Sequence, residues 1–209
     1  MTSSASPYFS RNPLVWTLVF LTALTWSAIE PRDRAVWWLE VLPALIGFAL
    51  LLFTRTRFPL TPLAYVLVLA HCIILFVGGH YTYAEVPLFD WIRDAFDHSR
   101  NNFDKVGHFA QGFVPAILAR EILIRHRVID GRVWLAFLVV CFCLAFSAFY
   151  ELIEWWVALL SEEAADAFLG TQGYVWDTQS DMGVALLGAI LALALFGRVH
   201  DRQLQACPA

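Results

Sequence analysis

The sequence predicts an all-α membrane protein, a single bundle of six transmembrane helices that takes up the whole chain, residues 1–209. Hydrophobic residues make up 59% of the chain, charged residues make up 15%, and the mean hydropathy is +0.62, whereas about 25% of an ordinary soluble domain is charged. Six stretches approach the roughly 20 apolar residues that a membrane-spanning helix needs. We find no linker, repeat or low-complexity tract that divides the chain, and no basic patch that indicates a nucleic acid partner.

The first apolar stretch follows Arg11, the only basic residue before it, and no cleavage site of small residues comes after it. We therefore expect a retained membrane helix rather than a cleaved signal peptide. The six expected spans are Pro13–Ile29, Ala35–Phe53, Thr61–Gly79, Phe103–Leu123, Val133–Leu160 and Ser180–Phe196. Between the third and fourth spans, residues 86–103 alternate large apolar side chains with charges, which is typical of a short amphipathic helix at the membrane surface.

The basic residues predict the orientation, because loops rich in Lys and Arg tend to remain in the cytoplasm. With six spans, nine of the 14 Lys and Arg residues fall on the side of the two termini, and five fall on the other side. The loop from Ser161 to Trp176 contains no Lys or Arg and carries three acids. The sequence thus predicts that both termini face the cytoplasm.

Ionisable residues within these apolar segments indicate a functional site, because each costs roughly 2.5–3.5 kcal/mol at membrane depth. They form three pairs with helical spacing: Asp104 and His108, Glu151 and Glu154, and Asp177 and Asp181. The predicted topology brings every pair, together with Lys105, to the same outer membrane face. Such agreement is not expected of scattered polar residues.

Small residues predict that the last three spans pack closely around this site. Glycines at 107, 112, 183 and 188 allow helix backbones to approach one another. On the fifth span Ser147, Glu151 and Glu154 share one helical face. We therefore expect a three-helix core that opens to the outside.

The charges of this core favour a bound cation. Five carboxylates face only Lys105 and the imidazole of His108, so the site must take up protons or bind a positive ion. Carboxylate oxygens with one imidazole suit Zn²⁺, Mn²⁺, Fe²⁺ or Mg²⁺, and the residue types do not select among them. The expected ligands of this divalent metal are Asp104, His108, Glu151, Glu154, Asp177 and Asp181.

Structural roles remain open for several of the same residues. Asp177 and Asp104 are each placed to cap the start of a helix, where a carboxylate accepts backbone N–H bonds. Lys105 can then extend toward the interface. Glu154 can pair with a loop arginine such as Arg93 or Arg100. On this alternative the cluster is a hydrogen-bonded network without a metal.

A further candidate follows the third span. Gly78 and Gly79 end an apolar run and allow a tight backbone path. His80 and Glu85 would then fold over the cleft as proton donors or additional ligands. The alternative for His80 is a solvated histidine at the membrane interface.

Four motifs at these positions together resemble those of the bacterial YjdF-like inner-membrane proteins. They are Gly-Gly-His-Tyr-Thr-Tyr from Gly78, Arg-Asn-x-x-Asp-Lys-x-x-His-Phe from Arg100, Tyr-Glu-x-x-Glu-Trp from Tyr150 and Gly-x-x-Gly-x-x-x-Asp-x-x-x-Asp from Gly170. The resemblance covers nearly the whole chain and implies a small multi-pass protein of the inner membrane, without implying a reaction.

A looser similarity to VanZ-like membrane proteins, which are associated with glycopeptide resistance, rests on residues 104–109 and on Glu151. Asp181 stands where that pattern has Asn, and Val184 stands where a glycine is expected. This similarity implies a shared architecture more than a shared function.

We therefore expect an enzyme within the membrane that acts at the outer face on a lipid or a lipid-linked envelope precursor, by hydrolysis or group transfer. Glu151 or Glu154 would serve as general base, Lys105 would lie near an anionic headgroup, and His80 would assist as a proton donor. One alternative is a protein that binds or shields a lipid or envelope component without catalysis. Another is a small proton-coupled transporter, which the absence of an evident internal repeat disfavours.

Overall fold

The computed structural model describes residues 13–160 and 171–206, and within these ranges every regular element is a helix. The α-helices are α1 (Pro13–Ala28), α2 (Arg34–Thr54), α3 (Pro62–Tyr81), α4 (Pro87–Ala95), α5 (Phe103–Arg125), α6 (Arg132–Leu160) and α8 (Asp177–Gln205). A single 3₁₀ turn, η1 (Tyr83–Glu85), lies between α3 and α4. The all-helical prediction is confirmed, and each expected span coincides with one long helix.

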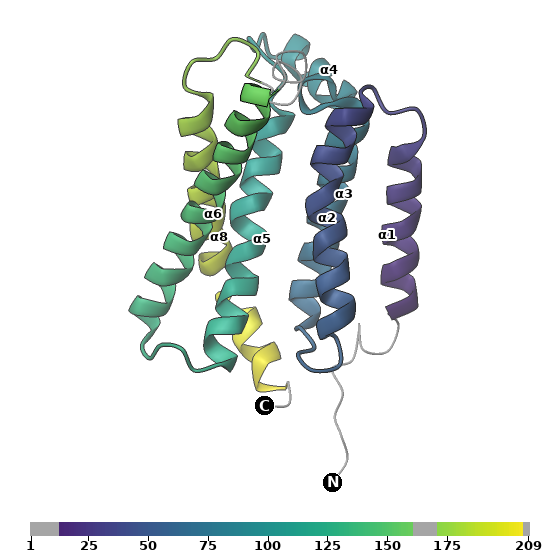
Figure 1. Cartoon of the computed structure of the whole chain (residues 1–209). Coiled ribbons are helices and arrows are strands. Elements are labelled where there is room, and N and C mark those ends of the chain that lie inside the picture. The colour runs from purple at the N-terminus through teal and green to yellow at the C-terminus, as the bar shows by residue number, and fades with distance from the viewer. Residues whose placement is uncertain (1–12, 161–170, 207–209) are drawn as a thin grey trace.

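The long helices run side by side, and α4 lies at one end of the bundle (Figure 1). The first half consists of α1, α2 and α3, and the second consists of α5, α6 and α8. Contact between α3 and α5 joins the halves, and the most extensive pairing is between α5 and α8. Because α1 begins and α8 ends at the end opposite α4, we refer to the two ends as the α4 end and the terminal end.

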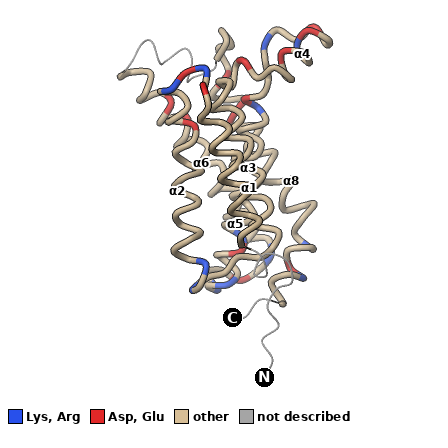
Figure 2. Tube along the Cα trace, turned by 90° about the vertical axis from the view of Figure 1, so that its right-hand side faces the viewer, with Lys and Arg blue, Asp and Glu red and all other residues tan. Residues whose placement is uncertain are grey.

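Charge distribution fits a membrane protein. Lys, Arg, Asp and Glu gather toward the two ends of the bundle, and the region between them is largely uncharged (Figure 2). Four of the described helices, α2, α3, α6 and α8, are long and apolar enough to cross a membrane. The α1 helix is apolar but has only 16 residues. The count of six spans therefore stays a prediction.

The short α4 helix corresponds to the amphipathic segment expected before the fourth span. It contains no buried residue, and Leu88, Trp91 and the adjacent Phe96 are exposed. Arg93 pairs on the same helix with Asp90 at 2.8 Å and with Asp94 at 2.9 Å. Its position in the membrane surface stays a prediction.

Local sequence explains where two helices begin. Asp33 precedes α2, and its carboxylate accepts hydrogen bonds from the backbone N–H groups of Ala35 and Val36 at 2.7 and 3.0 Å. Thr61 caps α3, and Pro62 fills the first helical position, where its missing N–H is not needed. The α3 helix ends at Tyr81, and the next residue, Thr82, has a φ of 59°.

Two glycines explain the close pairing of α5 with α8. A Cβ atom at Gly112 would overlap the backbone carbonyl of Ala185, and one at Gly188 would overlap that of Phe109. Gly107 serves a different contact, because a Cβ there would come within 2.6 Å of the Tyr83 ring. The remaining glycine of the predicted set, Gly183, has open space around it, so its expected packing role was wrong.

Candidate functional site

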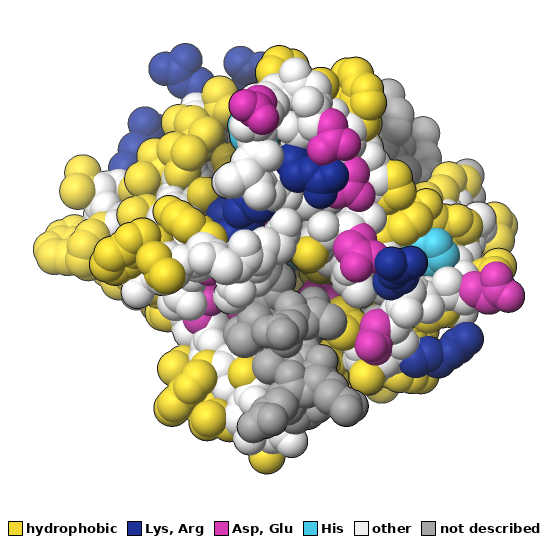
Figure 3. Space-filling view, turned by 90° about the horizontal axis from the view of Figure 1, so that it is seen from above, with side chains coloured by type: hydrophobic (Ala, Val, Ile, Leu, Met, Phe, Trp, Pro, Cys, Tyr) yellow, Lys and Arg dark blue, Asp and Glu magenta, His cyan; other side chains and the backbone are white. Residues whose placement is uncertain are grey.

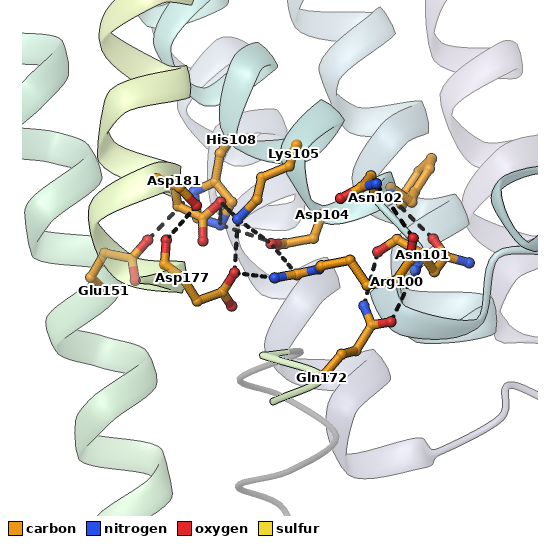
Figure 4. A network of polar contacts seen from close by, with 12 residues as sticks. Arg100, Asn101, Asn102, Asp104, Lys105, His108, Glu151, Gln172, Asp177 and Asp181 are labelled. Atoms are coloured by element: carbon orange, nitrogen blue, oxygen red, sulfur yellow. Dashed lines mark hydrogen bonds and ion pairs between the residues drawn. The ribbon is translucent and has the colours of Figure 1, made fainter. Parts of the chain in front are cut away.

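The candidate site lies at the α4 end, around His108 on the second turn of α5 (Figure 4). Its Nε2 atom is 3.3 Å from Asp104 Oδ1 and 3.9 Å from Asp181 Oδ1. Its Nδ1 atom is 3.0 Å from the Oε1 atom of Gln111 and 3.6 Å from that of Glu151. The imidazole therefore brings together carboxylates from α5, α6 and α8, as the spacing of the pairs predicts.

Two cations lie on one side of this histidine. Lys105 Nζ is 2.6 Å from Asp181 Oδ1 and 2.8 Å from Asp177 Oδ1, so it bridges the two carboxylates of α8. Arg100, in the segment before α5, lies 2.5 Å from Asp177 and 3.5 Å from Asp104. Arg100 is thus part of the cluster, but its partners are Asp104 and Asp177 and not the suggested Glu154.

The opposite side is formed by α6. Ser147, Glu151 and Glu154 are all buried, which agrees with the stripe predicted for this helix. Ser147 Oγ and Glu151 Oε1 are buried atoms that have no hydrogen-bond partner among the described residues. Buried polar atoms in this state are costly, so a further hydrogen-bond partner for either atom would stabilise the site.

All the acidic side chains of the cluster are largely removed from solvent. Asp181 is 2% exposed, Asp104 and Asp177 are each 6% exposed, and Glu151 and Glu154 are each 8% exposed. The charges of five carboxylates exceed those of Lys105 and Arg100, so the site is formally acidic whichever state His108 adopts. Seen from the α4 end, acidic and basic side chains mix across the face, and hydrophobic side chains occupy much of its rim (Figure 3).

Three of these residues lie close enough together that they could hold a metal ion. One ligand atom from each of Asp104, His108 and Asp181 lies within 4.8 Å of the other two. If the Nδ1–H of His108 donates to Gln111, its Nε2 lone pair faces both aspartates, which is how a metal-binding histidine is commonly oriented. Gln111 would then be the partner that fixes the tautomer.

Glu40 of α2 is a further acid near the site that sequence reasoning missed. It is 4% exposed, and the Tyr150 hydroxyl donates to its Oε2 atom at 3.3 Å. The sequence did indicate a special role for Glu40, since it is the only charged residue between Ala35 and Thr54. Burial, and then the nearby Glu40 carboxylate, raise the pKa of the Tyr83 hydroxyl well above its usual value, so Tyr83 remains a neutral donor.

Helix capping does not account for the aspartates. The residue that precedes α8 is Trp176, which makes no side-chain cap, and Asp177 is the first helical residue. The α5 helix begins at Phe103 after Asn102, which also makes no side-chain cap, and Asp104 lies inside the first turn. The capping alternative was therefore wrong for both residues, whose carboxylates face the cluster instead.

The suggested partners of Glu154 are engaged elsewhere. Arg93 pairs with two acids of α4. Arg100 pairs with Asp104 and Asp177. Glu154 is buried on the same face of α6 as Glu151 and forms no ion pair with another described residue.

His80 does not fold over the cluster as expected. One of its ring nitrogens, Nδ1, is 3.2 Å from the backbone oxygen of Ser27, and the ring lies against Trp26 at 4.6 Å between centroids. Glu85 pairs with Arg32 at 2.7 Å, on a surface where both side chains are at least half exposed. The structure places both residues against the connection between α1 and α2, so the expected fold over the cluster is not observed, and a catalytic role for His80 stays a prediction.

Comparison with known proteins identifies the family. The family described as "Predicted membrane protein (DUF2238)" matches residues 12–202. The chain belongs to this family. It is also 50% identical to the inner membrane protein YjdF of Escherichia coli (strain K12) over 206 residues, which cover 98% of this chain and 97% of that protein. No solved structure matches the chain.

The DUF2238 membership confirms the resemblance to YjdF-like proteins. Together with the apolar helices, it supports a multi-pass protein of the inner membrane that contacts membrane lipids. The looser similarity to VanZ-like proteins is not shown by these comparisons and stays a prediction.

Proposed function

We propose that this protein binds a divalent metal ion at the α4 end of the bundle and uses it in hydrolysis or group transfer on a lipid or lipid-linked envelope substrate. The observation that carries the proposal is the convergence of Asp104, His108 and Asp181 beside the Glu151 Oε1 atom, which has no hydrogen-bond partner among the described residues. One imidazole and several carboxylates are a ligand set that suits Zn²⁺, Mn²⁺, Fe²⁺ or Mg²⁺.

Electrostatics favour a divalent ion over further protons. The buried carboxylates outnumber the cations around them, and like charges in a poorly solvated site repel strongly. A doubly charged ion between α5 and α8 would offset that repulsion and offer a partner to Glu151 Oε1. Helical bundles commonly build metal sites from such inward-facing pairs on adjacent helices.

The residues around the ion have distinct proposed roles. Asp104, His108 and Asp181 would hold it, and a metal ion in this setting activates water or polarises a phosphoryl or acyl oxygen. Glu151, whose Oε1 atom lacks a partner, is placed to accept a proton as general base. Lys105 and Arg100 would attract an anionic headgroup while they hold Asp177 in position.

The orientation belongs to the same proposal. Loops at the terminal end carry most of the basic residues, so this end would face the cytoplasm and the metal site would face the outside. A site there has access to lipids and lipid-linked precursors of the outer leaflet. Glu154 and Asp177 would complete the acidic surroundings of the ion.

Two alternatives use the same cluster without catalysis. The extended network of ion pairs through Lys105 and Arg100 is compatible with a protein that only binds or shields a lipid or envelope component. Carboxylates and an imidazole that span three helices are also compatible with proton-coupled transport. Neither alternative requires a metal.

Metal content tests the proposal directly. We expect elemental analysis of the protein, purified in mild detergent, to give about one divalent ion per chain. Asp104→Ala and Asp181→Ala should each remove most of that metal, and the double variant should lose little more, because ligands of one ion act as a unit. Wild-type protein without metal, even after incubation with Zn²⁺ or Mn²⁺, would overturn the proposal in favour of the metal-free alternatives.

A further inference from the structure

A second feature lies at the terminal end, away from the metal site. A cavity of about 250 Å³ opens between α5, α6 and α8. It is lined by Arg120, Arg132, Leu135, Ala136, Leu193, Ala194, Gly197, Arg198 and Asp201. Gly197 is 16 residues beyond Asp181 on α8, which corresponds to roughly 24 Å at 1.5 Å per residue, so this cavity is separate from the candidate metal site.

The cavity is basic, with three guanidinium groups that come from three different helices and only one carboxylate. Arg120 is held in place, because it donates to His200 Nδ1 at 2.9 Å and forms an ion pair with Asp201. His200 is in turn 3.1 Å from Glu121, which is fully buried. Arg132 and Arg198 form no ion pair with any residue from 13 to 160 or from 171 to 206. Two exposed arginines of the lining therefore have no ion-pair partner among the described residues.

The rest of the lining is apolar, and the surrounding surface suits a membrane interface. Leu135 and Leu193 line the cavity beside the arginines, and Trp134 on α6 is 59% exposed next to it. Exposed tryptophans of membrane proteins are enriched at the level of the lipid headgroups. The cavity therefore combines a charged part with an apolar part, as a phospholipid does where its headgroup meets its acyl chains.

We propose that this cavity binds the phosphate headgroup of an anionic phospholipid. Arg132 and Arg198 would contact the phosphate, since a guanidinium fork matches phosphate oxygens well. Basic pockets between helices at a membrane surface are suited to anionic headgroups. The volume is just below the roughly 300–1,000 Å³ that pockets for whole drug-sized ligands have, so it fits a headgroup whose acyl chains remain in the bilayer.

The apolar half of the lining favours a lipid over free phosphate as the source of the anion. Inorganic phosphate has no apolar part to contact Leu135 or Leu193. A phospholipid places its phosphate and its glycerol carbons side by side, which matches the arrangement of the lining. The proposal is independent of the metal site, because no residue of that site lines this cavity.

Native mass spectrometry of the full chain in detergent, titrated with phosphatidylglycerol, phosphatidylcholine or inorganic phosphate, tests the assignment. We expect wild-type protein to retain phosphatidylglycerol preferentially. The double variant Arg132→Gln/Arg198→Gln should bind it about 30-fold more weakly. The matched control Arg55→Gln/Arg57→Gln removes two exposed arginines of the same end that do not line the cavity, and it should bind as the wild type does.

A second pair of variants tests the cavity by shape. Gly197 lines it and has open space around its Cα atom, so Gly197→Leu should fill the cavity without a clash and abolish lipid retention. Gly47→Leu also meets open space, but on α2, and should leave retention unchanged. Equal loss of lipid in the variants and their controls would overturn the assigned site. Binding of inorganic phosphate as tight as that of phosphatidylglycerol would overturn the lipid assignment.

Discussion

Lys105 is the residue whose removal should expose the energetics of the cluster most clearly. Its ammonium bridges Asp177 and Asp181, and the side chains of these two aspartates are only 7% and 3% exposed. Lys105→Met keeps the length of the side chain and removes the charge. The variant leaves two buried carboxylates without the cation that now lies 2.8 and 2.6 Å from them.

The size of the effect follows from burial. Removal of one partner of a buried ion pair costs roughly 3–5 kcal/mol. Because the Lys105 side chain is 19% exposed, we expect the lower end, about 3 kcal/mol. For a chain of this length that corresponds to a melting temperature lower by roughly 6–12 °C. If Asp181 binds a metal, a divalent ion at 100 times its dissociation constant should recover about 2.7 kcal/mol.

Thermal unfolding in detergent, first with a chelator and then with added Zn²⁺ or Mn²⁺, measures both quantities. The control is Arg32→Gln, which breaks an equally short pair with Glu85, 2.7 Å, between side chains that are 67% and 50% exposed. An exposed pair contributes below about 1 kcal/mol, so this control should hardly shift the transition. If Lys105→Met and Arg32→Gln shift it equally, the reasoning from burial is refuted.

Two further predictions concern packing and topology. Gly112→Leu should destabilise the α5–α8 pair by about 3 kcal/mol or more, because its Cβ overlaps the Ala185 carbonyl. It should therefore reduce the yield of monodisperse protein in size-exclusion chromatography. Gly183→Leu, in open space, should leave that yield unchanged, and equal yields from the two variants would contradict the packing account. In a background without native cysteines, a cysteine replacing the exposed Asp94 should react with an impermeant thiol reagent added to intact cells, whereas one replacing Arg57 should react only after lysis. The reverse pattern would place the polar cluster on the cytoplasmic face.

The helices were predictable because apolar length is a local property of the sequence. Each expected span lies within three residues of an observed helix at its start, and the six together form the bundle. The pairing of α5 with α8 was indicated by Gly112 and Gly188, small residues that predicted a close approach of the helices. Gly183 looked the same in the sequence, and only the rotation of α8 distinguishes it.

The core of the site was also predictable, since helical spacing and topology place the three ionisable pairs at one end. The positions of residues in the connections between helices were not predictable in this way. The position of Arg100 depends on the path of the chain between α4 and α5, which brings it to Asp177 across 77 residues of sequence. The position of His80 depends on the end of α3, where the ring turns toward Ser27 and away from the cluster. Placing Glu40 near the site would have required knowledge of which helix packs beside Tyr150.

The central claim, a metal held around His108, is tested most directly by His108→Gln. Glutamine retains bulk and hydrogen bonding but is a poor metal ligand, so the protein should still fold and insert. The account predicts that the divalent metal content of His108→Gln in elemental analysis falls to background. The control His126→Gln alters a ring that stacks on Phe58 at the far end of α5, and it should keep the wild-type metal content. Full metal content in folded His108→Gln protein would contradict the account.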